Sequence, residues 1–150
     1  MSDILHRVGI TGTPEEVFTA LTTIEGLASW WTEDTEGDVG PDGVIRFRFA
    51  GAPEPGGFDM KVLETKPAEL VRWEVVQGPE EWIGTQIRFD LKEEDGFTIV
   101  LFGHLGWKEP GEFMSHCSTK WATFLMSLKK LVETGTGEPS PHDVQISNWH

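Results

Sequence analysis

Residues 110–134 read PGEFMSHCSTKWATFLMSLKKLVET and carry the strongest helical pattern of the chain. Their apolar side chains recur every three or four residues, and at roughly 100° per residue they fall within an arc of about 120°. These side chains are Phe113, Cys117, Trp121, Phe124, Leu125, Leu128, Leu131 and Val132. Pro110 suits a first helical turn and Gly135 a C-terminal stop. The stretch predicts one long amphipathic helix, which needs a broad apolar surface to lie on.

The rest of the chain supplies that surface as short alternating segments. Apolar and polar residues alternate in ranges 4–10, 44–50, 57–65, 70–76 and 84–92, and turn-forming residues bound each range. This pattern is typical of strands with one buried and one solvated face, and the short connections favour an antiparallel sheet. The acidic residues gather in the turn-rich stretches 33–43 and 93–95, where we expect solvated loops.

Two short helices are expected after the first strand. Thr13 and Glu16 have the spacing of a capping box, with Pro14 at the first helical position. Gly26 is expected to break this helix, and residues 27–31 are expected to form a second one.

The segment from Phe97 to Leu105 is apolar on both faces, so its periodicity leaves two interpretations open. It is either a strand buried on both sides or a strand whose outer residues form an apolar patch for a partner or a second subunit.

Composition limits the classes of function. A chain of 150 residues is expected to form one domain over 1–150, with 135–150 as an extended C-terminal tail. The net charge of −13 opposes binding to nucleic acid or to an anionic membrane surface. No apolar run approaches the roughly 20 residues of a membrane-spanning helix. The chain has one cysteine, Cys117, and its N-terminus lacks the pattern of a secretory signal, which fits a cytoplasmic location.

No cofactor or metal is expected. The glycines form neither a dinucleotide-binding fingerprint nor a phosphate-binding loop. His104, His116 and Cys117 do not have the spacing of a zinc motif.

The order of these elements, an α+β arrangement of strand, two short helices, antiparallel meander and long closing helix, is a helix-grip layout. The sequence resembles the activator-of-heat-shock-protein-90-ATPase-homologue-like family of the START/Bet v 1-like (SRPBCC) superfamily. The resemblance covers nearly the whole chain. It rests on the Thr13–Phe18 segment, the Trp30-Trp31 pair, the run from Thr98 to His104 followed by Gly106-Trp107, Trp121 with its leucines, and the tail from Gly135 to Pro141.

The resemblance implies a curved antiparallel sheet wrapped around the C-terminal helix, with an apolar cavity between them. It also implies that His104, Phe102 and Val100 point inward, and that Ile99 and Leu101 point outward. Members of the superfamily bind lipids, hormones and polyketides, and some are cyclases or aromatases. The eukaryotic namesake stimulates a chaperone ATPase.

Twelve residues are candidates for the wall of this cavity. Seven Trp and nine Phe without any Tyr exceed what a simple small core needs, and such residues suit an apolar pocket. The candidates are Trp30, Trp31, Phe47, Phe49, Trp73, Trp82, Phe102, His104, Trp107, Phe113, Cys117 and Trp121. For each aromatic taken alone, core packing remains the competing role. The loop from Gly51 to Gly57 is either a lid at the cavity mouth or an ordinary hairpin connection.

His104 and Cys117 are the residues whose side chains could take part in a reaction. His104 is either a polar anchor inside the pocket or a core histidine with bonded ring nitrogens. A thiolate at Cys117 with His104 as base is conceivable, but an apolar setting would raise the thiol pKa and make it inert.

Three hypotheses follow for function. The first is binding of an apolar small molecule or lipid-like ligand between sheet and helix, without strong catalysis. The second is a cyclase-, aromatase- or hydrolase-like enzyme that uses His104. The third is a protein-interaction module, either a co-regulator of a chaperone in a stress response or a homodimer through Ile99 and Leu101.

Overall fold

The computed structural model describes residues 1–49 and 56–150. The helices are α1 (Pro14–Thr22), α2 (Ile24–Trp30) and α3 (Glu112–Thr134). The strands are β1 (Ser2–Ile10), β2 (Asp34–Gly37), β3 (Val44–Phe49), β4 (Gly56–Lys66), β5 (Leu70–Gln77), β6 (Gln86–Glu94) and β7 (Phe97–Trp107). The predicted loop from Gly51 to Gly57 lies outside the described residues, apart from Gly56 and Gly57, which begin β4.

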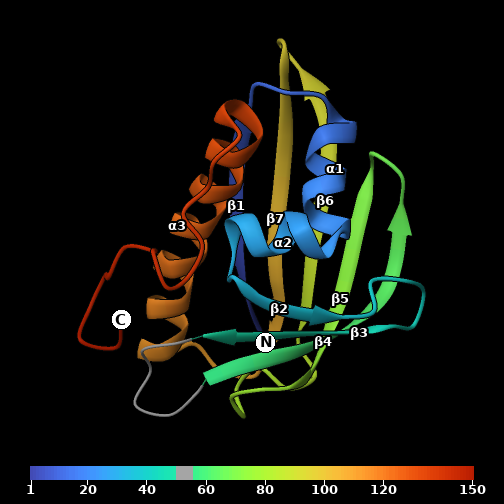
Figure 1. Cartoon of the computed structure of the whole chain (residues 1–150). Coiled ribbons are helices and arrows are strands. Elements are labelled where there is room, and N and C mark those ends of the chain that lie inside the picture. The colour runs from blue at the N-terminus through green and yellow to red at the C-terminus, as the bar shows by residue number, and fades with distance from the viewer. Residues whose placement is uncertain (50–55) are drawn as a thin grey trace.

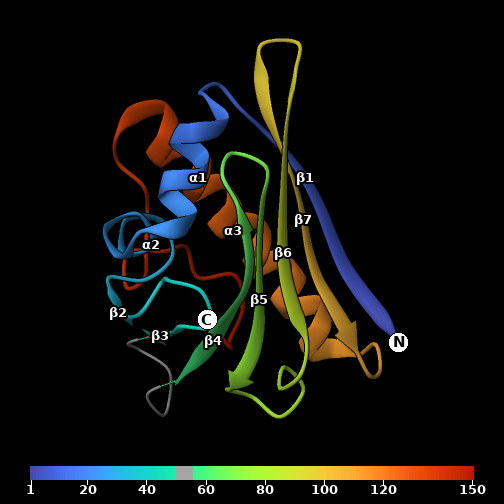
Figure 2. The same cartoon turned by 90° about the vertical axis from the view of Figure 1, so that its right-hand side faces the viewer.

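The described strands form one antiparallel sheet in the order β1-β7-β6-β5-β4-β3-β2. All three helices lie on one face of it, and in Figure 2 the central strands pass in front of α3, with α1 and α2 to their left. The sheet curves, so that β2 and β3 run across the direction of β6 and β7, below α2 in Figure 1. The predicted α+β helix-grip fold is confirmed. Among the described residues, none of the helices is both long and apolar enough to cross a lipid bilayer.

β2 lies in a stretch that was predicted to be turns. Its four residues pair with β3, with Thr35 opposite Phe47, and three of the four residues are exposed. Four residues are too few for an alternation of apolar and polar side chains to stand out in the sequence. The strand is defined by its backbone pairing alone.

The first two helices meet at Thr23 rather than at Gly26. The capping box is present, because the Thr13 hydroxyl accepts from the Glu16 N–H and the Glu16 carboxylate accepts from the Thr13 N–H. Thr23 ends α1 and caps α2, where its hydroxyl accepts from the Gly26 N–H. Gly26 therefore lies inside α2, and a Cβ there would come within 2.7 Å of the Ala20 backbone. The glycine serves a close approach of two helices, which a sequence pattern cannot distinguish from a break.

α3 begins two residues later than Pro110, at Glu112, because Gly111 takes the capping position. It ends as predicted at Gly135, which has a φ of 88° and donates its N–H to the Leu131 carbonyl. The predicted stripe faces the sheet. Its buried members are Cys117, Trp121, Phe124, Leu125 and Leu128, and Phe113, Leu131 and Val132 pack half-buried at its ends.

Strand β7 resolves the two interpretations of its apolar faces. Val100, Phe102 and His104 point inward and are buried. On the outer face Leu101 is 38% exposed, whereas Ile99 is only 4% exposed. A Cβ at Gly9 on the neighbouring strand would meet both Phe97 and Ile99, so these side chains cover one another where β1 offers no side chain. The outer face is apolar, but Ile99 is not available on it.

Residues 135–150 fold back over α3 and contain no helix or strand, although the structure describes all of them. Ser140 accepts from the Glu33 N–H at 3.0 Å and donates its own N–H to the Trp31 carbonyl at 2.8 Å. Beyond this point the chain runs along the N-terminal half of α3, where Lys120 pairs with Asp143. We call residues 140–150 the C-terminal strap.

The other end of α3 is fastened to β1 by a polar network. The Glu133 carboxylate accepts from the Thr11 N–H at 2.7 Å and from the Lys129 ammonium at 2.8 Å. Lys129 also donates to the Gly9 carbonyl at 2.6 Å. The hydrogen bond from Lys129 and that from Thr11 lower the pKa of Glu133 to about 2.

Replacing Glu133 by Gln removes this carboxylate, and we expect the free energy of unfolding at pH 7 to fall by about 1 kcal/mol because the group is partly solvated. Its folded pKa of about 2 lies below the ordinary 4.5, so its stabilisation is complete above about pH 4.5 and disappears as pH falls toward 2. Urea unfolding at pH 7 and at pH 2.5 measures both effects.

Glu138→Gln is the matched control, since its ion pair with Lys130 is about half exposed and is worth under about 0.5 kcal/mol. A stability gap between Glu133→Gln and the unmodified chain that stays constant down to pH 2 would contradict the assignment.

Candidate functional site

A pocket of about 260 Å³ lies between the N-terminal half of α3, the start of β4 and the C-terminal strap. Its walls combine apolar side chains from sheet and helix with polar side chains from the strap and from α3. The apolar wall contains Trp31, Phe49, Phe58, Pro79, Trp82, Phe113, Cys117, Trp121 and Phe124. The polar part contains His116, Lys120, Ser140, Asp143 and His150, with Trp149 beside them.

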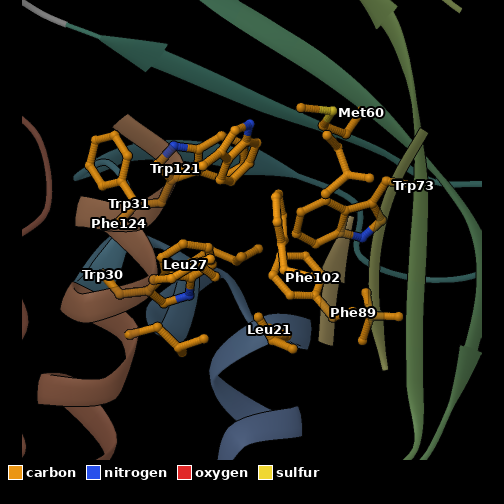
Figure 3. Close-up of a cluster of buried hydrophobic side chains, with 14 of the residues drawn as sticks. Leu21, Leu27, Trp30, Trp31, Met60, Trp73, Phe89, Phe102, Trp121 and Phe124 are labelled. Atoms are coloured by element: carbon orange, nitrogen blue, oxygen red, sulfur yellow. The ribbon is translucent and has the colours of Figure 1, made fainter. Parts of the chain in front are cut away.

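The aromatic wall is held by ring-to-ring packing. Trp31 lies 4.9 Å from Trp121 between ring centroids, and Phe58 stacks on Trp82 at 4.0 Å with planes 9° apart. Trp121 and Phe124 project from α3 toward Trp31, as Figure 3 shows. These rings therefore join α3 to the C-terminal end of α2, where Trp31 is the capping residue. Interlocked rings give the wall a fixed shape, because moving one ring displaces its neighbours.

Half of the twelve predicted wall residues border this pocket. Those that border it are Trp31, Phe49, Trp82, Phe113, Cys117 and Trp121. Those that lie elsewhere are Trp30, Phe47, Trp73, Phe102, His104 and Trp107, all of them buried in the core. Trp73 and Phe102 lie on the sheet side of the cluster in Figure 3, and neither borders the pocket. Alternation identifies the inner face of a strand, but it does not tell which end of that face stays open.

Several wall residues were not predicted from the sequence. Phe58 shares the inner alternation of β4 with Met60, and Phe124 belongs to the α3 stripe, so a signal existed for both. The polar wall gave no signal, because Asp143 and His150 belong to a segment without periodicity that was expected to be an extended tail.

His104 lies behind the pocket wall with both ring nitrogens occupied. Nδ1 accepts from the Trp121 indole N–H at 3.1 Å, and an indole nitrogen can only donate. Nε2 lies 2.8 Å from the Thr85 hydroxyl, which donates its own hydrogen to the Trp82 carbonyl. These partners require the neutral tautomer with the proton on Nε2.

Burial reinforces this neutral state. His104 is 0% exposed, and desolvation lowers its pKa to about 3. A general base must reach the proton that it removes, and here neither nitrogen has a free direction. The arrangement suits a core histidine that fixes Trp121 and Thr85, and it offers nothing to a catalytic role.

Cys117 borders the pocket as a neutral thiol. Desolvation raises its pKa to about 12, so the nucleophilic thiolate is scarce near pH 7. Among residues 1–49 and 56–150, no three of His, Cys, Asp and Glu converge as metal ligands.

The strap and α3 together contribute the charged groups of the pocket. The Lys120 ammonium lies 2.5 Å from Asp143 Oδ2, and both side chains are largely buried. His116 Nδ1 lies 3.0 Å from the Ser147 hydroxyl, and its ring contacts Trp149. The pKa of His116 is lowered by desolvation first, then by Lys120 and His150.

Comparison with known proteins agrees with this architecture. The sequence model of the family described as "Activator of Hsp90 ATPase homolog 1-like protein" matches residues 11–133. No curated protein sequence matches the chain.

Solved structures share the fold. One is the solution structure of the Aha1 dimer from Colwellia psychrerythraea, with 45% identity, a TM-score of 0.82, and coverage of 91% of this chain and 100% of that one. The protein SSP2350 from Staphylococcus saprophyticus has 16% identity and a TM-score of 0.73, over 91% of this chain and 95% of that one. CalU16 from Micromonospora echinospora has 18% identity and a TM-score of 0.77, over 99% and 75%.

The hydrogen bond from the Trp121 indole to His104 Nδ1 is what we call the histidine lock. Trp121→Phe tests it, because this change keeps an aromatic ring at the pocket but leaves His104 Nδ1 without a donor. We expect the free energy of unfolding to fall by about 2 kcal/mol, the cost of an unpaired buried acceptor together with the lost ring volume. Urea unfolding followed by circular dichroism measures it. Trp149→Phe is the control at a half-exposed ring and should change stability by under about 0.5 kcal/mol. Equal losses in the two variants would contradict the lock.

Proposed function

The chain belongs to the family of activator of Hsp90 ATPase homolog 1-like proteins, and from this membership we propose that it binds an apolar small molecule between the sheet and α3. The observation that carries the proposal is the unfilled volume of about 260 Å³ lined mainly by apolar and aromatic side chains. Transfer of an apolar ligand from water to such a wall is favourable in proportion to the area buried. The fixed rings reduce the ordering cost of binding.

Binding without strong catalysis fits the chemistry of the wall. His104 is neutral, fully bonded and set behind Trp82 and Trp121, and Cys117 is a protonated thiol. The cyclase-, aromatase- or hydrolase-like alternative through His104 therefore has no support in the geometry.

Cys117→Phe places a ring inside the pocket and tests the proposal. We expect N-phenyl-1-naphthylamine, an uncharged dye that fluoresces in apolar surroundings, to bind the unmodified chain and to bind Cys117→Phe at least about ten-fold more weakly. A fluorescence titration measures both dissociation constants, and circular dichroism checks that each variant is folded.

Met126→Phe is the matched control, since Met126 lies on the same helix with its side chain 53% exposed. It should bind the dye like the unmodified chain. Absence of dye binding to the unmodified chain, or equal binding by Cys117→Phe, would overturn the proposal.

A second candidate function is self-association through the outer face of β1 and β7. Leu5 is 69% exposed and lies opposite Gly103, where a Cβ would touch the side chains of both Leu5 and Leu105. With Leu101 these residues form an apolar patch, which we call the outer patch. The relative with 45% identity is a dimer. Ile99, which the sequence analysis placed in a homodimer contact, is too buried to take part.

Paired charges surround the outer patch. Arg7 pairs with Glu94 at 2.6 Å, and Arg88 pairs with Asp90 at 2.7 Å on the neighbouring strand. An apolar centre with a charged rim is the usual composition of a protein interface, and a patch on a two-fold axis must complement itself.

Leu101→Glu places a charge at the centre of the outer patch. We expect the unmodified chain to dimerise at concentrations around 100 μM, and Leu101→Glu to be monomeric there because two buried carboxylates would face one another. Light scattering coupled to gel filtration gives the mass. Met126→Glu, with the same change at an exposed apolar residue of α3, should remain dimeric. A monomeric unmodified chain would remove this candidate.

A co-regulatory role beside a chaperone in the cytoplasm, as part of a stress response, is the third candidate. The family description supports it by naming an activator of a chaperone ATPase. Addition of the purified chain to a chaperone ATPase assay tests it directly.

A further inference from the structure

The base of the C-terminal strap is firmly anchored. A Cβ at Gly137 would come within 2.4 Å of the Ser29 carbonyl oxygen, so the chain lies directly on α2 just before the strap. Ser140 is 3% exposed, and its backbone is bonded on both sides, to the Trp31 carbonyl and to the Glu33 N–H. The chain cannot shift here without breaking buried hydrogen bonds.

Beyond Ser140 the anchoring changes abruptly. The described chain from 141 to 150 contains no helix or strand, and none of its residues is buried as a whole. Val144 and Trp149, two of its large apolar side chains, are 53% and 49% exposed, so little apolar area holds the strap down. A segment with so few buried apolar contacts is among the first parts of a fold to open locally.

Two polar residues of α3, one turn apart, hold the strap. Lys120 Nζ lies 2.5 Å from Asp143 Oδ2 and donates to the Val144 carbonyl at 2.5 Å. His116 Nδ1 lies 3.0 Å from the Ser147 hydroxyl. The pair of Lys120 and Asp143 is the strongest of these contacts, because it joins opposite charges on side chains that are 15% and 3% exposed. We call this pair the latch.

The latch is an ion pair with an internal cost. Asp143 Oδ1 is buried and has no hydrogen-bond partner among the residues that the structure describes. The closed strap therefore carries the cost of an unpaired carboxylate oxygen, which water would satisfy in an open strap. Opening also loses the attraction to Lys120, so two opposed contributions leave a small difference. Such a balance allows the strap to open reversibly.

The strap forms one side of the pocket. Asp143 and Trp149 border the pocket, and both belong to the weakly held segment beyond Ser140. The interlocked rings of Trp31 and Trp121 belong to the end of α2 and to α3. Movement of the strap away from α3 therefore widens the pocket while these rings stay in place.

We propose that residues 141–150 are a gate, which swings about Ser140 when the latch between Lys120 and Asp143 opens, and that ligands enter and leave the pocket through the side that the gate uncovers. The gate rests on the proposed function, because it controls access to the same pocket. Opening a gate raises the rates of association and dissociation together, whereas loss of a contact with the ligand changes mainly the rate of dissociation.

Lys120→Met tests the latch, because it keeps an unbranched side chain at the pocket and removes both contacts of Lys120 with the strap. The Asp143 carboxylate is then left without a cation, and we expect it to move into water together with the strap. Stopped-flow fluorescence with N-phenyl-1-naphthylamine at pH 7 gives both rates. Each should rise at least about ten-fold, with their ratio within about three-fold of that in the unmodified chain.

The double variant Lys120→Met/Asp143→Leu should close the gate again. Apolar side chains can replace a buried ion pair without loss of stability, so both rates should return to within about three-fold of those in the unmodified chain. Lys130→Met is the matched control. It removes a half-exposed pair with Glu138, next to the base of the strap, and should leave both rates unchanged.

Hydrogen exchange in the unmodified chain locates the hinge without any variant. The Ser140 N–H donates to the Trp31 carbonyl at 2.8 Å, and the His142 N–H donates to the Pro139 carbonyl at 2.7 Å across the hinge. Both N–H groups are bonded, but only the second bond breaks when the strap swings. After correction for intrinsic rates, we expect the His142 N–H to exchange at least about ten-fold faster by NMR.

The outcomes separate the gate from the proposed function. If the dye binds but Lys120→Met leaves both rates unchanged or raises only the rate of dissociation, the pocket binds apolar ligands and the gate is wrong. The gate is equally wrong if the double variant keeps the rates of Lys120→Met, or if the Ser140 and His142 N–H groups exchange alike. If the dye does not bind the unmodified chain, the proposed function fails and the gate fails with it. The exchange measurement decides the question where Lys120→Met does not fold.

Discussion

The hydrogen bond from the Trp121 indole to His104 Nδ1 joins α3 to strand β7 of the sheet, and the rest of the architecture depends on it. Packing alone would let an amphipathic helix slide along an apolar surface, because the hydrophobic effect has no direction. A buried donor and acceptor fix one register, since every other register leaves both unpaired. The chain of contacts continues from His104 through Thr85 to the Trp82 carbonyl, so the same lock holds the turn that carries Trp82.

This lock divides α3 into two parts with different tasks. On the C-terminal side of Trp121, Leu125 and Leu128 are fully buried, and Glu133 and Lys129 fasten the end of the helix to β1. On the N-terminal side, Phe113 and Cys117 border the pocket and Lys120 holds the strap. Trp121 belongs to both parts, since one edge of its ring bonds to His104 while the ring also borders the pocket. A pocket beside such a lock keeps its shape without a ligand.

The fold could be predicted from the sequence because its determinants are local. Alternation defined the long strands, and the capping box and Gly135 defined helix ends, each within a few residues of chain. β2 and the position of Gly26 could not be predicted, since the first is defined by backbone pairing with β3 and the second by the packing of α2 against Ala20 of α1, and neither leaves a pattern in the sequence. Only half of the predicted wall residues border the pocket, for the same reason. The inner faces of strands and helix were visible in the sequence, but the closed end of the sheet, which buries Trp73 and Phe102, was not. The packing of the strap on α3 was not predicted, because the position of Asp143 depends on an ion pair with Lys120, which lies 23 residues earlier in the chain.

His104 and Asp143 show two ways in which this fold accommodates a buried polar group. Both are polar groups placed where water is excluded, and both would destabilise the fold if unpaired. His104 has a partner at each nitrogen, and its low pKa follows from burial in a neutral, fully bonded state. Asp143 has a partner at one oxygen and none at the other. A fold can pair all of its buried polar atoms internally, as it does around His104. At Asp143 the pairing is incomplete because Lys120 approaches one oxygen only, and the cost of the unpaired oxygen is set against the ion pair that fastens the strap to α3.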